Sequence, residues 1–481
     1  MREPAPKTLA ELQARLDQQV NQPRQGGALW GVKIASLDTG RVWFEHHADR
    51  LLSPASNCKL YAGAMALDRL GGDYRIVTPV MGTAKPGSDG VLRGDVVVAG
   101  RGDPSWHSRG SKGTFADLFA PFVAVLRNAG VKRVAGDIVA DATWFRGVPQ
   151  GAGWTADDLN DDYGAEVSAI SLEDNYAEIR VAPGAREGAA AEVTIIEPHT
   201  GLVLDNRVKT VAKGGVRRID VTRLIGENVV HIFGEMPLGE KPAITEATVP
   251  KPASWFAAAL KAELVRAGIA VDGLARGVRW PEAAPDTTAG AKLGEITSPP
   301  LRDLVAAFMK PSQNLETNMI FNHVGEMSRG PETPARRTSE ELGVGALQEF
   351  LKKRGLPADE VRFEEGSGLS RNNLATANAT VALLTYMAKH PEGKAYEAGL
   401  PVAGVDGTLR RRMKGTPAEG KVHAKTGTLR YANSLSGYLT TAAGERLVFA
   451  AMLNRSIPVL GRPARDDLDE LAVLLAGFAG K

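Results

Sequence analysis

The chain has 481 residues, a length typical of about three domains. Its composition, 43% hydrophobic and 24% charged, is that of an ordinary soluble globular protein. A net charge of +2 gives no electrostatic indication of nucleic-acid binding, and no apolar run approaches the roughly 20 residues of a membrane-spanning helix. We therefore expect neither a nucleic-acid partner nor a transmembrane segment. The single cysteine excludes an internal disulfide.

The first 80 residues predict a helix, a hairpin and a second helix. Thr8 followed by Glu11 resembles a capping box, and it opens a helix whose apolar stripe runs from Leu9 to Val20. Residues 30–46 alternate around a turn and predict a β-hairpin. Residues 59–70 place apolar side chains on one helical face that ends at a Gly-Gly pair.

The middle of the chain, from about 80 to 290, has a different character. Short alternating stretches broken by Gly, Pro and Asp predict a β-rich region, with one helix over 254–269. Helices return from about 300, followed by a hairpin over 434–453 and a last helix over 466–479. Since the two ends of the chain resemble each other in type, one α/β domain split by a large β-rich insertion explains this order more simply than three domains in series.

We expect this division to follow five segments. The outer α/β domain takes the two ends, an insertion domain takes two inner parts, and a second β-rich domain is inserted within it. In chain order the segments are 1–80 (outer), 81–164 (insertion), 165–250 (second inserted domain), 251–290 (insertion) and 291–481 (outer).

A serine and a lysine lie three residues apart at the start of the second predicted helix. Ser56 is the only serine followed by lysine at the third position, here Lys59. Residues i and i+3 share a helical face. A serine hydroxyl is a poor nucleophile until a base takes its proton, and an unprotonated lysine can be that base. The alternative is a helix cap with a surface lysine. Cys58 is the rival nucleophile, but on a helix it would point away from Ser56.

Two further motifs make the catalytic interpretation stronger. The tripeptide Lys425-Thr426-Gly427 occurs once, just before the late hairpin, where a strand can line a site wall. There the lysine would supply positive charge, the threonine a hydroxyl, and the glycine room for substrate against the backbone; the alternative is an exposed edge lysine before a turn. Ser-x-Asn occurs at 312–314 and 370–372, and we favour the first, in the break between two amphipathic helices.

The three motifs together resemble the S-x-x-K, S-D-N and K-T-G set of penicillin-binding proteins and class A β-lactamases. The chain resembles more closely the D-alanyl-D-alanine carboxypeptidases of the low-molecular-mass class C penicillin-binding proteins, a family with a long insertion between the first two motifs. Here 256 residues separate Ser56 from Ser312. The similar segments, in order, are residues 52–60, 99–105, 136–145, 366–373, 400–412 and 424–439. Gln313 departs from the family's usual Asp.

The resemblance implies a β-lactamase/transpeptidase-like domain, an antiparallel sheet flanked by helices, split by the insertion. It implies that Ser56 attacks the bond between two terminal D-alanines of a peptidoglycan peptide, with Lys59 as base. Ser312 would relay the proton to the leaving amine, Asn314 would bind the substrate amide, and Lys425 would keep the site electropositive. Neither a metal nor an organic cofactor is needed, and β-lactam antibiotics are expected inhibitors.

Further expectations follow from the same resemblance. Lys425, Thr426 and Thr428 would hold the substrate carboxylate, and the backbone N–H groups of Ser56 and Thr428 would form the oxyanion hole. Cleavage of peptide cross-links is an expected second activity.

Two residues of the insertion are also candidates for substrate binding. Asp141 and Trp144 lie in a segment rich in Asp and Trp, which the resemblance brings near the site. The alternative is an exposed turn with a core tryptophan.

The location follows from the substrate. The N-terminus has no apolar stretch of a signal peptide, so the protein is either cytoplasmic or has lost its leader; a cell-wall substrate favours a periplasmic or otherwise extracytoplasmic enzyme with the leader removed. A β-lactamase or esterase of the same superfamily, and a non-catalytic cell-wall-binding protein, remain the alternatives.

Overall fold

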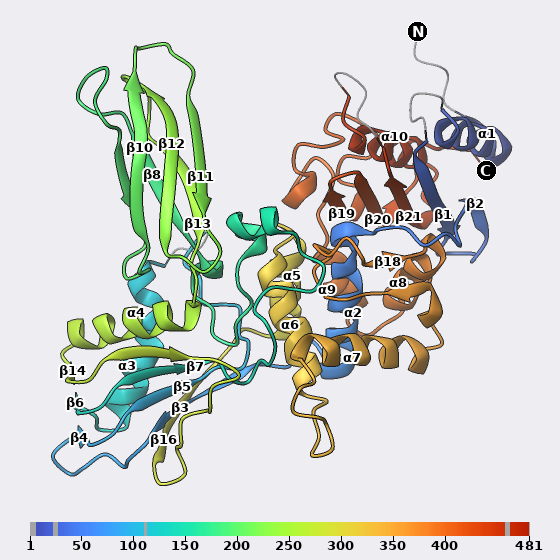
Figure 1. Ribbon diagram of the computed structural model, residues 1–481. Coiled ribbons are helices and arrows are strands. Elements are labelled where there is room, and N and C mark those ends of the chain that lie inside the picture. The colour runs from blue at the N-terminus through green and yellow to red at the C-terminus, as the bar shows by residue number, and fades with distance from the viewer. Residues whose placement is uncertain (1–5, 23–26, 110–112, 457–461, 481) are drawn as a thin grey trace.

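The computed structural model describes residues 6–22, 27–109, 113–456 and 462–480. The chain forms a helix-and-sheet domain from its two ends, hereafter the outer domain, and an elongated β-rich insertion from its middle (Figure 1). None of the helices in these described ranges combines the length and apolar character that a bilayer crossing requires.

A five-stranded antiparallel sheet forms the centre of the outer domain. Its strand order is β19-β20-β21-β1-β2. The strands are β1 (Leu29–Ser36), β2 (Val42–His46), β19 (Val422–Leu429), β20 (Ala432–Thr440) and β21 (Arg446–Asn454). The hairpins predicted over 30–46 and 434–453 are β1–β2 and β20–β21, so both predictions are confirmed.

Helices cover both faces of this sheet. On one face α1 (Leu9–Val20) and α10 (Arg465–Ala476) share a buried core with side chains of β1, β20 and β21. The helices of the other face are α2 (Cys58–Leu70), α5 (Leu301–Met309), α6 (Asn314–Glu326), α7 (Ser339–Lys353), α8 (Ala377–Ala388) and α9 (Gly393–Ala398). This is the predicted antiparallel sheet flanked by helices.

Helix α2 lies at the centre of the second group. Its first ten residues are all buried, which its sequence permits because small and apolar residues occur all round the helix. At Gly63 a Cβ atom would lie 2.9 Å from Met309 Cε, so this glycine lets α5 approach closely. The short β17 (Val361–Arg362) and β18 (Leu374–Ala375) pair beside this group.

The part of the insertion next to the outer domain is built on two sheets and two helices. The larger sheet has the order β15-β7-β5-β3-β16 and the smaller the order β14-β6-β4. The elements are β3 (Val77–Gly82), β4 (Val91–Leu92), β5 (Val96–Ala99), α3 (Ala120–Asn128), β6 (Arg133–Val134), β7 (Ile138–Asp141), α4 (Pro252–Arg266), β14 (Ala270–Val271), β15 (Ala275–Val278) and β16 (Ala291–Thr297). They share one hydrophobic core.

The far part of the insertion consists of two three-stranded sheets around a separate core. Their strands are β8 (Tyr176–Ala182), β9 (Glu192–Ile195), β10 (Val203–Val211), β11 (Arg218–Arg223), β12 (Val229–Pro237) and β13 (Ala243–Thr248). Short 3-10 turns connect many elements of the molecule: η2 (Ala55–Asn57), η3 (Phe115–Phe119), η4 (Ala156–Asn160), η5 (Asp162–Gly164), η6 (Glu173–Asn175), η7 (Ala358–Glu360) and η8 (Gly407–Leu409).

Strand pairing moves the expected limits of the insertion. β3 and β16 pair with each other in the larger sheet of the insertion, so the expected limit at 80/81 cuts through β3 and the limit at 290/291 assigns β16 to the wrong domain. We propose 77–297 for the insertion and 176–248 for its far part. The region also contains a second helix, α3, which the sequence did not predict because it is short and has Pro121 in its first turn.

Candidate active site

Ser56 lies in a strained turn at the start of α2. The turn is η2, and Ala55 within it has φ +46°, a left-handed conformation that non-glycine residues rarely adopt. The sheet holds the turn in place, because Ser434 Oγ on β20 donates a hydrogen bond of 2.6 Å to Pro54 O. The half-buried serine hydroxyl is therefore presented on a rigid support rather than on a mobile loop.

Lys59 is completely buried next to this serine. Its Nζ lies 3.1 Å from Ser56 Oγ, 2.6 Å from Asn314 Oδ1 and 2.7 Å from Ser367 O. Burial lowers the pKa of Lys59 to about 8, although the negative charge of Glu365 acts in the opposite direction. The predicted pairing of serine and lysine one helical turn apart is therefore present, and the lowered pKa makes a neutral fraction of this lysine available near physiological pH.

A second buried lysine contacts a second serine. Lys425 Nζ on β19 donates hydrogen bonds to Ser312 Oγ at 2.7 Å and to Thr426 O at 2.9 Å. Burial, followed by the charges of Lys59 and Arg412, lowers the pKa of Lys425 well below its usual value. Among the described residues no carboxylate forms an ion pair with Lys425, so the site holds an uncompensated cationic group when this lysine is protonated.

Ser312 and Asn314 come from the break between α5 and α6. Ser312 has φ +71°, which directs its hydroxyl away from the regular helix path. Asn314 is the first residue of α6; its Oδ1 accepts from Lys59, and its Nδ2 donates to Tyr163 O in the insertion at 3.0 Å. Gln313, where the resemblance expects Asp, caps α6 by accepting from Leu315 N.

Helix α6 is anchored in both hydrophobic cores. Leu315 and Met319 belong to the core of the insertion, whereas Ile320, Phe321 and Val324 belong to the core of the outer domain. The helix that carries Asn314 is therefore fixed by the packing of both parts of the molecule, and it lies between them in Figure 1.

The Lys-Thr-Gly motif lies on the edge strand of the sheet. Thr426 Oγ1 forms a hydrogen bond of 2.7 Å with Thr408 Oγ1, and Thr428 is exposed. Gly427 is closely packed: a Cβ there would lie 2.2 Å from Ser434 Oγ and 2.6 Å from Pro54 O. The missing side chain makes room for the turn that carries the serine, and the expected role of Gly427 beside the substrate stays a prediction.

The second Ser-x-Asn, at 370–372, has other partners. Ser370 Oγ and Asn372 Nδ2 both donate to Glu364. The loop before it nevertheless reaches the site, because Ser367 O accepts from Lys59. The two buried lysines therefore contact the Ser-x-Asn at 312–314: Lys425 binds Ser312 and Lys59 binds Asn314. This is the copy of the motif that the sequence favoured.

One buried carboxylate that the sequence did not single out shapes this loop. Glu365 accepts hydrogen bonds from five donors: Ser367 N, Ser367 Oγ, Gly368 N, Ser370 N and Asn373 Nδ2. These bonds fix the loop that presents Ser367 O to Lys59. No spacing rule would have identified Glu365, because its partners are three backbone N–H groups and two polar side chains of residues 367–373, close to it in the chain.

Asp141 and Trp144 lie at the interface between the insertion and α6. Asp141 is buried at the end of β7 and accepts from Thr143 N. The Trp144 ring stands edge-on to His323 of α6 at 5.0 Å and beneath the Arg101 guanidinium at 5.4 Å. His323 is nine residues after the start of α6, or about 13 Å along the helix. A role of Asp141 and Trp144 in substrate binding stays a prediction.

Cys58 belongs to the core. It is fully buried, its Sγ accepts from Asn373 Nδ2 at 3.3 Å, and burial raises the pKa of its thiol well above the usual value. A protonated, inaccessible thiol is a poor nucleophile, so the rival to Ser56 that the sequence offered is unsuited to this role.

A serine on a strained turn, two buried lysines and an Asn-containing loop, all beside the edge strand of an antiparallel sheet, define an active-site-serine enzyme of the penicillin-binding class. The sequence profile described as "D-Ala-D-Ala carboxypeptidase 3 (S13) family" matches residues 12–475. The chain belongs to this family and is a serine-type D-Ala-D-Ala carboxypeptidase, a low-molecular-mass class C penicillin-binding protein. This finding confirms the carboxypeptidase prediction over the β-lactamase, esterase and non-catalytic alternatives.

Similar proteins support the assignment over almost the whole chain. A D-alanyl-D-alanine carboxypeptidase of Actinomadura sp. (strain R39) is 32% identical over 98% of this chain and 86% of its own length. The D-alanyl-D-alanine carboxypeptidase DacB of Haemophilus influenzae is 25% identical over 89% of this chain and 86% of its own. The crystal structure of penicillin-binding protein 4 from H. influenzae has the same fold, with a TM-score of 0.80 at 24% identity over 95% of this chain and 97% of that one.

Proposed function

We propose that the carboxypeptidase reaction proceeds through an acyl-enzyme on Ser56, with Lys59 as the general base. The contacts of Lys59 support this role. A neutral lysine has two N–H bonds and one lone pair, and its three partners are two pure acceptors, Asn314 Oδ1 and Ser367 O, and one hydroxyl, Ser56 Oγ. Two donated bonds therefore aim the lone pair at the serine proton. This geometry is the observation that carries the proposal.

The reaction then runs in two halves. Ser56 Oγ attacks the carbonyl carbon between the two terminal D-alanines while its proton passes to Lys59, and the N–H groups of Ser56 and Thr428 stabilise the oxyanion. Ser312, in contact with Lys425, relays the proton from Lys59 to the leaving amine, so that both residues regain their starting protonation states, and D-alanine departs as the C–N bond breaks. Water then attacks the ester and releases the shortened peptide and the free serine.

The C-terminal carboxylate of the substrate would supply the negatively charged partner that Lys425 lacks. A C-terminal carboxylate beside Lys425, Thr426 and Thr428 would favour the protonated form of this lysine, whose pKa is well below its usual value in the free enzyme. A protonated Lys425 in turn disfavours protonation of Lys59. Substrate binding would thus prepare the base, and a substrate with an amidated C-terminus would lose both effects.

β19 also offers a backbone surface for the peptide. It is the edge strand of the five-stranded sheet, so an extended peptide can add beside it through main-chain hydrogen bonds. Asn314 would bind the amide before the scissile bond. A β-lactam presents an amide and a carboxylate in similar positions, which makes Ser56 the expected site of covalent modification.

Two measurements test the proposal. Intact-mass analysis after incubation with benzylpenicillin should give one adduct on the wild type and none on Ser56→Ala, and D-alanine release from an acyl-D-Ala-D-Ala peptide should be lost in the same variant. An adduct that persists in Ser56→Ala, or a wild type that reacts with neither compound, would contradict the assignment of the nucleophile.

The expected location follows from the same substrate. Stem peptides of peptidoglycan lie outside the cytoplasmic membrane, so we infer that the mature enzyme works in an extracytoplasmic compartment. Cell fractionation with an antibody to the protein tests this inference.

A further inference from the structure

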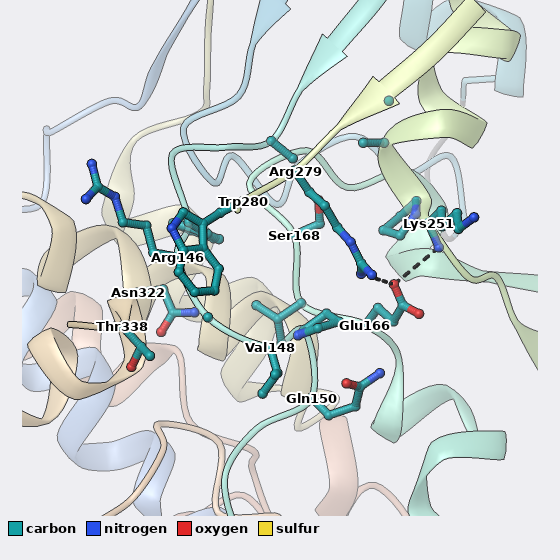
Figure 2. A pocket seen from close by; sticks show the side chains of 18 of the residues that line it. Arg146, Val148, Gln150, Glu166, Ser168, Lys251, Arg279, Trp280, Asn322 and Thr338 are labelled. Carbon is teal, nitrogen blue, oxygen red and sulfur yellow. Dashed lines mark hydrogen bonds and ion pairs between the residues drawn. The ribbon is translucent and has the colours of Figure 1, made fainter. Parts of the chain in front are cut away.

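A cavity of about 410 Å³ lies between the insertion and the outer domain. Its walls come from the 145–151 segment, the start of α4, the end of β15, α6 and the start of α7. Figure 2 shows it from close by. Ser56, Lys59, Ser312 and Lys425 do not line it, so it is separate from the nucleophile and its base. Cavities at domain interfaces are common ligand sites.

An unpartnered amide faces this cavity. Asn322 on α6 is only 9% exposed, it lines the cavity, and its side chain has no hydrogen-bond partner among the described residues. A buried amide normally has its donors and acceptor satisfied. The half-buried indole of Trp280 stands near it, with Val148 opposite (Figure 2). The wall thus combines a flat aromatic face with a free amide.

Two charged groups of the cavity compensate each other. Glu166 accepts from Lys251 N at 3.2 Å and lies 3.6 Å from Arg279 Nη1, the two contacts drawn in Figure 2. Burial, followed by the charge of Glu365, raises the pKa of Glu340 to about 8, so at neutral pH this carboxyl is mostly an uncharged donor. Trp280 and Asn322 offer an apolar face and a hydrogen-bonding group, which together match the two faces of a sugar ring, and Arg146, Lys251 and Glu282 line the remaining wall.

The spacing along α6 between the residue that contacts Lys59 and the residue that faces the cavity is comparable with the length of a stem peptide. Three asparagines occur at four-residue intervals on α6, and positions i, i+4 and i+8 share one helical face. The first, Asn314, contacts Lys59, and the last, Asn322, faces the cavity, about 12 Å further along the axis. The four residues that precede the terminal D-alanine of a pentapeptide span at most about 14 Å when extended.

We propose that this cavity binds an N-acetylated amino-sugar unit of the glycan strand that carries the peptide cleaved at Ser56. The acetamido group would pair with the free amide of Asn322, and the apolar face of the ring would lie on Trp280. The proposal rests on the function proposed above, because the peptide is joined to the glycan through its N-terminus. The cavity would give the enzyme a preference for peptides still attached to the cell wall.

Direct binding tests the cavity without any cleavage. In isothermal titration calorimetry, the N-acetylglucosamine trimer should bind the wild type saturably and at least tenfold more tightly than cellotriose, which has no acetamido groups. Asn322→Leu removes the amide at similar volume, and Val148→Trp fills the cavity from a position that is 78% exposed. Both should lose binding, whereas the matched control Val216→Trp, 63% exposed on the far part of the insertion, should bind like the wild type.

Kinetics then connect the cavity to the substrate. The wild type should have a higher kcat/KM for a pentapeptide on its disaccharide than for the free pentapeptide. In Asn322→Leu and Val148→Trp this advantage should fall by about fivefold, the effect of roughly one hydrogen bond. Both variants should cleave the free pentapeptide and react with penicillin at wild-type rates, which shows that the active site is intact.

Two results would overturn the proposal: no binding of the trimer to the wild type, or unchanged binding in both cavity variants. A wild type that binds the trimer through Asn322 but cleaves neither peptide would keep the sugar site and contradict the proposed function, so the two failures are distinguishable.

Discussion

At the scale of single residues, the site depends on two lysines that burial makes weak bases. The pKa of Lys59, about 8, sets the pH at which a neutral amine becomes available. Below pH 8 this lysine is mostly protonated, so the acylation rate should fall about tenfold for each pH unit; above pH 8 the rate should level off. Stopped-flow acylation by a chromogenic cephalosporin between pH 5 and 10 measures this dependence.

The variant Lys59→Met provides the control for this profile. It should acylate about 10²- to 10⁴-fold more slowly, the usual contribution of a general base, and the remaining rate should no longer follow the titration near pH 8. A wild-type rate that is the same at pH 6 and pH 9 would show that Lys59 is not the base.

Glu365 would position Lys59, the proposed base, without touching the serine. Its charge raises the pKa of Lys59, and its five hydrogen bonds fix the loop that ends at Ser367 O. In Glu365→Gln the amide would turn an N–H toward backbone donors, so acylation should slow. Because the raising charge is gone, the remaining activity should also titrate at lower pH than in the wild type, and pH profiles of kcat/KM measure both effects.

A neighbouring glutamate separates this effect from general damage to the loop. Glu364 accepts from the same loop through Ser370 and Asn372, but it does not contribute to the pKa of Lys59. Glu364→Gln should therefore keep the wild-type pH midpoint. An unshifted midpoint in Glu365→Gln would mean that Glu365 is only structural.

At the scale of elements, the edge strand and the serine turn are fitted together through a glycine. Gly427→Ala would place a Cβ within 2.6 Å of Pro54 O, which is backbone and cannot yield without moving the turn. We expect acylation to fall by at least tenfold and the melting temperature to decrease. Gly345→Ala is the matched control: this glycine lies inside α7 with open space at its Cβ, so the substitution should leave acylation unchanged and stabilise the helix slightly. Equal acylation in both variants would contradict the close fit.

The elements themselves were predictable where their causes are local. The two hairpins and the helices α1, α4 and α10 follow from alternation, periodicity and turn residues within 10 to 20 positions. The pairing of β3 with β16 joins segments about 200 residues apart, and no local pattern indicates it. The same holds for the site: the spacing of Ser56 and Lys59 is visible in the sequence, whereas the contact of Asn314 with Tyr163 O depends on the packing of two domains.

At the scale of the whole molecule, α6 makes the insertion part of the active site. One side of this helix packs in the core of the insertion and the other in the core of the outer domain, and its first residue contacts Lys59. The insertion therefore does more than add a separate module, because loss of its packing would displace Asn314. Stability of the insertion and reactivity of the serine should be coupled.

Met319→Ala tests this coupling from a side chain that packs in the core of the insertion. Met319 is fully buried in the insertion core, and its truncation should cost about 2–5 kcal/mol of stability. Because α6 also carries Asn314, acylation by penicillin should slow together with the decrease in melting temperature. Met327→Ala, at the end of the same helix and 54% exposed, should change neither quantity measurably. A Met319→Ala protein that melts earlier but acylates at the wild-type rate would show that the outer domain alone fixes the position of Asn314.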